Sequence, residues 1–175
     1  MLSIGDAAPD FELLSDENKP VKLSDFRGQR VILFFYPKAA TSGCTTQACG
    51  FRDNYAAIQA ASGVVIGLSP DAPEALAKWK TEEHFPYPLL SDPDHIVAEA
   101  YDVWGEKKMY GNSYMGIIRS HFVVGADGTI EDVQYKISPQ NSVEKAVEFV
   151  SSGSGGVRRK NPLVSRPLLF NYQGS

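Results

Sequence analysis

The sequence has few cysteines and no long hydrophobic run. Its 175 residues include two cysteines, too few for a disulfide-stapled scaffold or for a structural zinc site built on thiolates. No apolar stretch approaches the roughly 20 residues that a membrane-spanning helix needs. The opening residues lack a basic region followed by an apolar segment. We therefore predict no secretory signal and a cytoplasmic location, with nucleus or organelle as the alternative in a eukaryotic source.

The sequence also lacks an excess of charge. Charged residues make up 22% of the chain and the net charge is −4, which argues against a disordered chain and against a nucleic-acid-binding protein. The hydrophobic fraction of 43% suits a globular domain with a buried core. The three histidines, His84, His95 and His121, do not have the spacing of metal ligands. We predict no metal, no membrane and no nucleic acid as partner.

Two apolar runs predict strands at the centre of a sheet. Residues 31–36 and 64–69 are continuous, β-rich and apolar, as is typical of strands buried on both faces. Between them, residues 45–61 repeat apolar side chains at helical spacing. A strand, a helix and a strand over this length predict a parallel pair joined by a crossover helix.

The remaining pattern completes an α/β fold. Helices are predicted over 72–84, 93–101 (with Asp92 as a cap) and 142–150, and hairpins over 11–23 and 119–136. Residues 109–114 lie in a segment rich in glycine and lysine and are predicted to form a loop. Together these elements predict a mixed sheet flanked by helices.

The end of the chain differs in composition from the rest. We predict one domain over residues 1–150, followed by a glycine- and serine-rich linker over 151–156. Residues 157–175 contain four basic residues and no acidic one. This tail is either a natural extension or a peptide appended through the linker, and the sequence leaves both origins open.

Cys44 lies where a buried strand has ended and a helix begins. Unpaired amide groups and the positive end of the helix dipole favour a thiolate over a thiol at such a position. A thiolate is the nucleophilic form of cysteine, so this position favours reactivity without a separate base. Thr41 precedes it and is placed to contact the sulfur or an incoming oxygen, or else to cap the helix. Pro37 is predicted to rigidify the same loop and limit the access of water.

The second cysteine, Cys49, follows Cys44 at a spacing that an intact helix cannot bridge. Residues i and i+5 of a helix have Cα atoms roughly 8–9 Å apart, and a disulfide needs less than about 7 Å. If the two cysteines form a redox pair, the start of the helix must unwind, which is plausible because helix ends have low local stability. The alternative is that Cys49 packs in the core.

These residues resemble a known family. Pro37, Thr41 and Cys44 match the active-site pattern of peroxiredoxins, and Cys49 stands where the peroxiredoxin Q (bacterioferritin comigratory protein) branch often keeps its resolving cysteine. Further similar segments are 5–11, 34–38, 50–53, 90–92 and 116–122, so the resemblance runs from about Ile4 to Val150. Residues 39–42 depart from it, since the family more often has polar residues and a proline there.

The resemblance implies a thioredoxin-like fold with an N-terminal β-hairpin extension, and it places Arg119 beside Cys44. It also implies an activity. Cys44 reduces a hydroperoxide and becomes a sulfenic acid, Cys49 condenses with it to a disulfide, and thioredoxin or a similar dithiol reduces the disulfide. No cofactor is implied, and the branch is often monomeric, with a weak dimer as the alternative.

Two other functions are weighed against this one. A dithiol oxidoreductase of the thioredoxin type shares the expected fold, but its cysteines are separated by two residues, and here four residues intervene. A non-enzymatic holdase, or a scaffold that displays the C-terminal peptide, is suggested by the linker and the basic tail.

Overall fold

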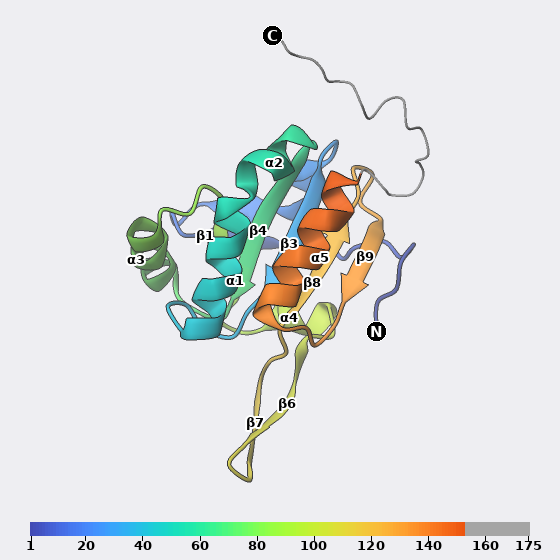
Figure 1. The fold of residues 1–175 in the computed structure, drawn as a ribbon. Coiled ribbons are helices and arrows are strands. Elements are labelled where there is room, and N and C mark those ends of the chain that lie inside the picture. Colours follow the sequence, from blue (N-terminus) through green and yellow to red (C-terminus); the bar gives the residue numbers. More distant parts are fainter. Residues whose placement is uncertain (153–175) are drawn as a thin grey trace.

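A seven-stranded mixed β-sheet runs through the middle of the protein (Figure 1). The computed structural model describes residues 1–152. The strands of this sheet, in spatial order, are β2 (Pro20–Lys22), β1 (Glu12–Ser15), β5 (Leu89–Ser91), β4 (Gly63–Ser69), β3 (Arg30–Phe35), β8 (Ser120–Val124) and β9 (Ile130–Gln134). A separate two-stranded sheet consists of β6 (Trp104–Met109) and β7 (Asn112–Ile117).

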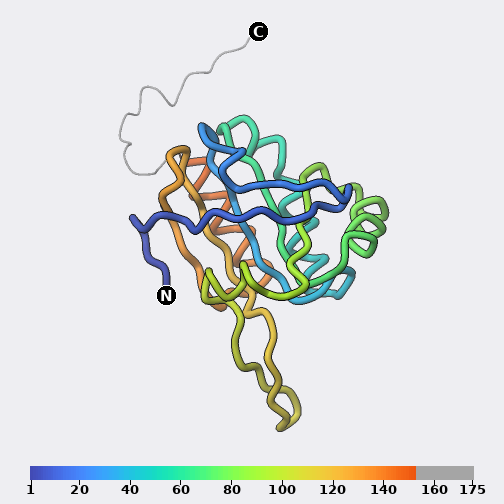
Figure 2. The backbone as a smooth tube through the Cα atoms, turned by 180° about the vertical axis from the view of Figure 1, so that it is seen from behind, coloured from blue at the N-terminus to red at the C-terminus, as the bar shows by residue number. Residues whose placement is uncertain are grey.

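The centre of the sheet confirms the prediction from the apolar runs. β3 and β4 are parallel, with Val31 opposite Val64 and Phe35 opposite Leu68. β8 pairs antiparallel with β3, and β8 and β9 form the predicted hairpin. The N-terminal hairpin β1–β2 is also present, and it extends the main sheet because β1 pairs antiparallel with β5 (Figure 2).

Helices cover both faces of the sheet. They are α1 (Ser42–Asp53), α2 (Tyr55–Ala60), α3 (Pro73–Glu83), α4 (Ile96–Ala100) and α5 (Pro139–Ser151), together with the 3₁₀ helix η1 (Leu23–Phe26). Alternate side chains of a strand point to opposite faces. Accordingly, Ile32 and Phe34 pack in a cluster with residues of α1, α2, α3 and α5, whereas Leu33 and Phe35 pack with η1 and α4.

The helices predicted over 72–84 and 142–150 correspond to α3 and α5 within three residues at each end. The other two predicted helices also differ from those in the structure. The predicted helix over 45–61 is divided into α1 and α2 at Asn54, whose side-chain amide donates to the Gly50 carbonyl at 2.8 Å and so competes with the helical backbone. The helix predicted from residue 93 begins only at Ile96. The Asp92 carboxylate nevertheless caps it, because it accepts hydrogen bonds from the amides of Val97 and Ala98.

The prediction of a loop over 109–114 is wrong, because these residues belong to the β6–β7 hairpin. Tyr110 and Gly111 both have positive φ values, 53° and 82°, as a tight hairpin turn of this kind requires. The hairpin projects away from the main sheet (Figures 1 and 2). Most of its side chains are exposed or half-buried, so the sequence carries no alternation of apolar and polar residues there.

The last helix, α5, ends at Ser151. The rest of the predicted linker and the basic tail over 157–175 lie outside the described residues, so the division of the chain into domain, linker and tail stays a prediction. Within residues 1–152, no helix is both long and apolar enough to cross a membrane.

Candidate active site

The site begins with Cys44 at the N-terminus of α1. The connection from β3 delivers the chain to Thr41, the N-cap of the helix, and Cys44 occupies the first turn. The amides of this turn have no intrahelical acceptor and the helix dipole is positive there. The Cys44 side chain is buried, with 1% of its surface exposed. The sulfur therefore lies inside the protein, next to the unpaired amides at the start of α1.

Arg119 meets Cys44 from the segment between β7 and β8. Its Nη2 lies 3.5 Å from Cys44 Sγ, while Nη1 donates to Gln47 Oε1 at 2.7 Å. A side chain at Gly43 would crowd this approach, because a Cβ there would lie 3.1 Å from Arg119 Nη2 and the guanidinium would have to shift by a few tenths of an ångström. The glycine before the cysteine therefore lets the guanidinium lie against the first turn of α1.

A chain of buried polar groups holds Gln47 in place. Gln47 Nε2 donates to Ser142 Oγ at 2.9 Å, and Ser142 Oγ lies 2.7 Å from His121 Nδ1. Because the Ser142 oxygen already accepts from Gln47, its own hydrogen is available to His121 Nδ1. All three side chains are fully buried. On the far side, His121 Nε2 lies 3.9 Å from Asp132 Oδ2, within ion-pair range but beyond a hydrogen bond.

Thr41 and Pro37 lie in the connection between β3 and α1. The Thr41 hydroxyl donates to the Lys38 carbonyl at 2.7 Å, and its side chain accepts no amide hydrogen of α1. The alternative prediction, that the Thr41 side chain caps α1, is therefore wrong for this conformation. The hydroxyl is bonded within its own loop instead. Pro37 directly follows Tyr36 and is partly buried. Both residues shape the path of the chain into the helix.

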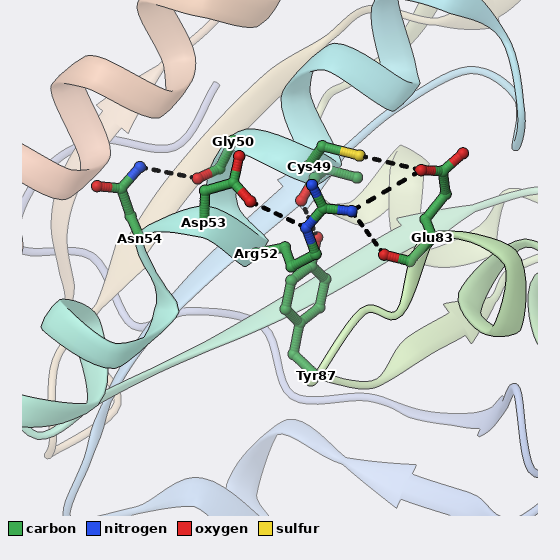
Figure 3. A network of polar contacts seen from close by, with 8 residues as sticks. Cys49, Gly50, Arg52, Asp53, Asn54, Glu83 and Tyr87 are labelled. Carbon is green, nitrogen blue, oxygen red and sulfur yellow. Dashed lines mark hydrogen bonds and ion pairs between the residues drawn. The ribbon is translucent and has the colours of Figure 1, made fainter.

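Cys49 lies further along α1 in a different environment (Figure 3). Both cysteines are free thiols, and the helix that separates them is continuous. Cys49 Sγ donates to Glu83 Oε1 at 3.4 Å. Burial raises the pKa of Cys49, and the hydrogen bond to Glu83 raises it further. Cys49 is thus held as a thiol, at a distance from Cys44 that an intact helix cannot close.

Comparison with known proteins identifies the family to which this arrangement belongs. Residues 4–133 match the AhpC/TSA family. The chain belongs to the AhpC/TSA family. A putative peroxiredoxin bcp from Haemophilus influenzae is 47% identical over 151 residues, which cover 86% of this chain and 97% of the relative.

Solved structures agree with this assignment to the peroxiredoxins. The crystal structure of peroxidoxin BcpB from Mycobacterium tuberculosis has a TM-score of 0.78 and 33% identity, and the match covers 88% of this chain and 99% of that one. The bacterioferritin comigratory protein of Xanthomonas campestris has a TM-score of 0.78 and 27% identity, over 86% of this chain and 96% of that one. The predicted family, the thioredoxin-like fold and the class of thiol-dependent peroxidase are thereby confirmed.

A cavity of about 730 Å³ opens beside Arg119 of this peroxiredoxin. It is lined by Glu106, Lys107, Lys108, Ile118, Arg119, Lys136, Ile137 and Ser138. Burial and the neighbouring Arg119 lower the pKa of Lys107, whose Nζ donates to the Ile117 carbonyl at 2.7 Å. Four of the eight lining residues are basic and one is acidic, and the cavity gives access to the guanidinium that contacts Cys44.

The residues that support Arg119 were not predicted from the sequence. Gln47 had a usable signal, because residues three apart on a helix share a face and Gln47 follows Cys44 at that spacing. Ser142 and His121 had none, since they come from α5 and β8 and meet Gln47 only through the fold. Likewise, nothing in the local sequence placed Glu83 beside Cys49.

Proposed function

We propose that this peroxiredoxin reduces hydrogen peroxide and organic hydroperoxides, with Cys44 as the attacking thiolate and Cys49 as the resolving thiol. The contact of 3.5 Å between Arg119 Nη2 and Cys44 Sγ carries the proposal. A guanidinium stabilises a thiolate and donates to a peroxide oxygen as charge develops on it. The match to an alkyl-peroxide-reducing protein of Xanthomonas campestris supports organic substrates, and the adjacent cavity has room for them.

The proposed reaction has three steps. The Cys44 thiolate attacks the terminal peroxide oxygen, the O–O bond breaks, and the leaving oxygen takes a proton to give water or an alcohol. The resulting sulfenic acid condenses with the Cys49 thiol, so that an S–S bond forms and water leaves. Thioredoxin or a similar dithiol then reduces this disulfide by thiol–disulfide exchange and is itself oxidised.

The remaining roles belong to the same proposal. Thr41 contacts the sulfur or the incoming peroxide once its hydroxyl leaves the Lys38 carbonyl, which it binds in this structure. Pro37 fixes the loop that leads into α1. The resemblance to the peroxiredoxin Q branch supports a monomer and a reaction that needs no cofactor, and we place the enzyme in the cytoplasm.

Replacing Arg119 by methionine is expected to slow the oxidation of Cys44 by about 10²–10³-fold, the cost of removing one donor from the site of developing charge. The second-order rate constant, measured by stopped flow with hydrogen peroxide, checks this. Arg27→Met is the control, because Arg27 is exposed on the η1 side of the protein. Equal rates for Arg119→Met and wild type would contradict the proposed role of the guanidinium.

Replacing Ser142 by alanine is expected to destabilise the protein by roughly 1–3 kcal/mol. The change leaves Gln47 Nε2 and His121 Nδ1 buried without their shared partner, and an unsatisfied buried polar group carries a cost of this size. Denaturant unfolding measures the free energy. Glu144→Ala, at an exposed position of α5, should change it by less than about 0.5 kcal/mol. A similarly small change for Ser142→Ala would show that the hydrogen bonds among Gln47, Ser142 and His121 contribute little to the free energy of unfolding.

A further inference from the structure

The second half of α1 is hydrogen-bonded to the end of α3 and to the segment that joins α3 to β5 (Figure 3). Tyr87 donates its hydroxyl to the Ala48 carbonyl at 2.6 Å. Cys49 Sγ donates to the Glu83 carboxylate at 3.4 Å. Arg52 Nη1 donates to the Glu83 backbone carbonyl at 2.7 Å. Three consecutive attachments therefore hold the stretch of helix that carries the proposed resolving cysteine.

Glu83 takes part in two of these three attachments. It ends α3, its carboxylate accepts the Cys49 hydrogen, and its carbonyl accepts the Arg52 guanidinium. Arg52 Nη1 also lies 3.8 Å from Glu83 Oε1, and Arg52 Nε is bonded to Asp53. This arrangement orients the carboxylate towards the sulfur and holds Cys49 on the flank of α1.

The proposed reaction requires Cys49 to leave this position. A disulfide with Cys44 cannot form while α1 is intact, so the helix must open between the two cysteines. Formation of the S–S bond also removes the Cys49 hydrogen, and with it the hydrogen bond to Glu83. The Glu83 carboxylate also disfavours the thiolate of Cys49, and the thiolate is the form that attacks sulfur. Both effects delay resolution.

We propose that Glu83 is a positioning residue that acts through Cys49 and slows the resolution step, so that it sets the lifetime of the Cys44 sulfenic acid. This inference rests on the proposed function. A longer-lived sulfenic acid has more time to meet a second peroxide, which oxidises the sulfur to a sulfinic acid and is reduced to water or an alcohol. Glu83 thereby sets the peroxide concentration at which the enzyme becomes overoxidised.

The charged and titratable groups around Cys49 are few. Glu83 approaches from α3, and Arg52 and Asp53 come from α1 itself. Tyr87 approaches from the segment before β5, and burial raises its pKa so far that it stays neutral. Among these groups, Glu83 is the one whose side chain accepts the thiol hydrogen. Removing its charge is therefore the most direct change to the resolving thiol.

The test uses full-length Glu83→Gln, with Glu82→Gln as the control because Glu82 is the adjacent, exposed carboxylate of α3. Stopped-flow fluorescence after stoichiometric hydrogen peroxide, combined with mass analysis of quenched samples, separates oxidation from disulfide formation. We expect the second-order oxidation of Cys44 to be unchanged. The first-order resolution step of Glu83→Gln should be about three- to tenfold faster, because the glutamine oxygen still accepts the thiol hydrogen but a hydrogen bond to a neutral acceptor is weaker than one to a carboxylate by about this factor.

Two further measurements and one further variant test the same inference. The resolution rate should rise with pH as Cys49 ionises, and in Glu83→Gln this rise should occur at lower pH. At high peroxide, less sulfinic acid should accumulate in Glu83→Gln than in wild type. Tyr87→Phe, which frees the Ala48 carbonyl without changing the charge near Cys49, should also resolve faster, but with the wild-type pH profile.

An unchanged resolution rate in Glu83→Gln would overturn the inference. A slower rate would also overturn it and make Glu83 a proton acceptor for Cys49 instead. Both results leave the proposed function standing, because wild type still forms the disulfide. If wild type forms no Cys44–Cys49 disulfide, the proposed function itself fails and this inference fails with it.

Discussion

Replacing Cys44 by serine is expected to abolish peroxide turnover. Cys44 is the cysteine that Arg119 contacts, at 3.5 Å, and it lies in the first turn of α1. A serine hydroxyl at this position stays protonated at neutral pH and is not oxidised by peroxide, so no sulfenic acid forms. Peroxide consumption, followed directly and through a thioredoxin-linked assay, should fall to the uncatalysed rate.

The buried position of Cys44 requires a folding control for this variant. Its side chain is 1% exposed, and the change to serine introduces a hydroxyl next to Arg119. Thermal unfolding should therefore show a cooperative transition close to that of wild type. A folded Cys44→Ser variant with substantial peroxidase activity would transfer the attacking role to another residue.

Replacing Cys49 by serine is expected to stop the cycle after one oxidation. The chain has two cysteines, so without Cys49 the sulfenic acid of Cys44 has no thiol partner in the same molecule. Stopped flow should show one equivalent of peroxide reduced at the wild-type rate, because the Cys44 environment is unchanged. The thioredoxin-linked assay should then show no steady turnover.

The same variant tests where the resolving thiol lies. Sustained turnover of Cys49→Ser with thioredoxin would mean that an external thiol or a second chain resolves the intermediate. Sulfinic acid on Cys44 at high peroxide, in contrast, is the expected fate of a sulfenic acid that finds no thiol. Mass analysis of the oxidised variant distinguishes the two results.

The sequence predicted the elements whose side chains are buried in a regular pattern. β3 and β4 were recognisable because they are apolar between their ends and covered on both faces. The position of Cys44 at the start of a helix followed from the end of β3 and the helical spacing after it. The hairpin β6–β7 was missed because neither of its faces is buried, so its strands do not alternate in polarity.

The supporting contacts of the site depend on tertiary structure. Arg119 was assigned by resemblance to peroxiredoxins, whereas its bond to Gln47 joins residues 72 positions apart. The bonds from Gln47 to Ser142 and from Cys49 to Glu83 span 95 and 34 positions. No local pattern encodes such pairs, because they join α1 to the segment before β8, to α5 and to the end of α3.

The two thiols have contrasting environments although they belong to one helix. Cys44 faces a guanidinium at the positive end of α1, and Cys49 faces a carboxylate on its flank. Burial and the hydrogen bond to Glu83 raise the pKa of Cys49, whereas the Cys44 sulfur has a hydrogen-bond donor beside it. This difference is the basis on which we propose Cys44 as the attacking residue and Cys49 as the resolving one.

The most direct test of this account is to identify the sulfur that peroxide oxidises first. The Cys49→Ser variant is treated with one equivalent of hydrogen peroxide in the presence of dimedone, which traps sulfenic acids, and the adduct is located by mass spectrometry of peptides. We predict one adduct per chain, on Cys44. In the double variant that also carries Arg119→Met, the adduct should form much more slowly or not at all. Peroxide consumption without an adduct on Cys44, or a Cys44 thiol that does not react, would contradict the account.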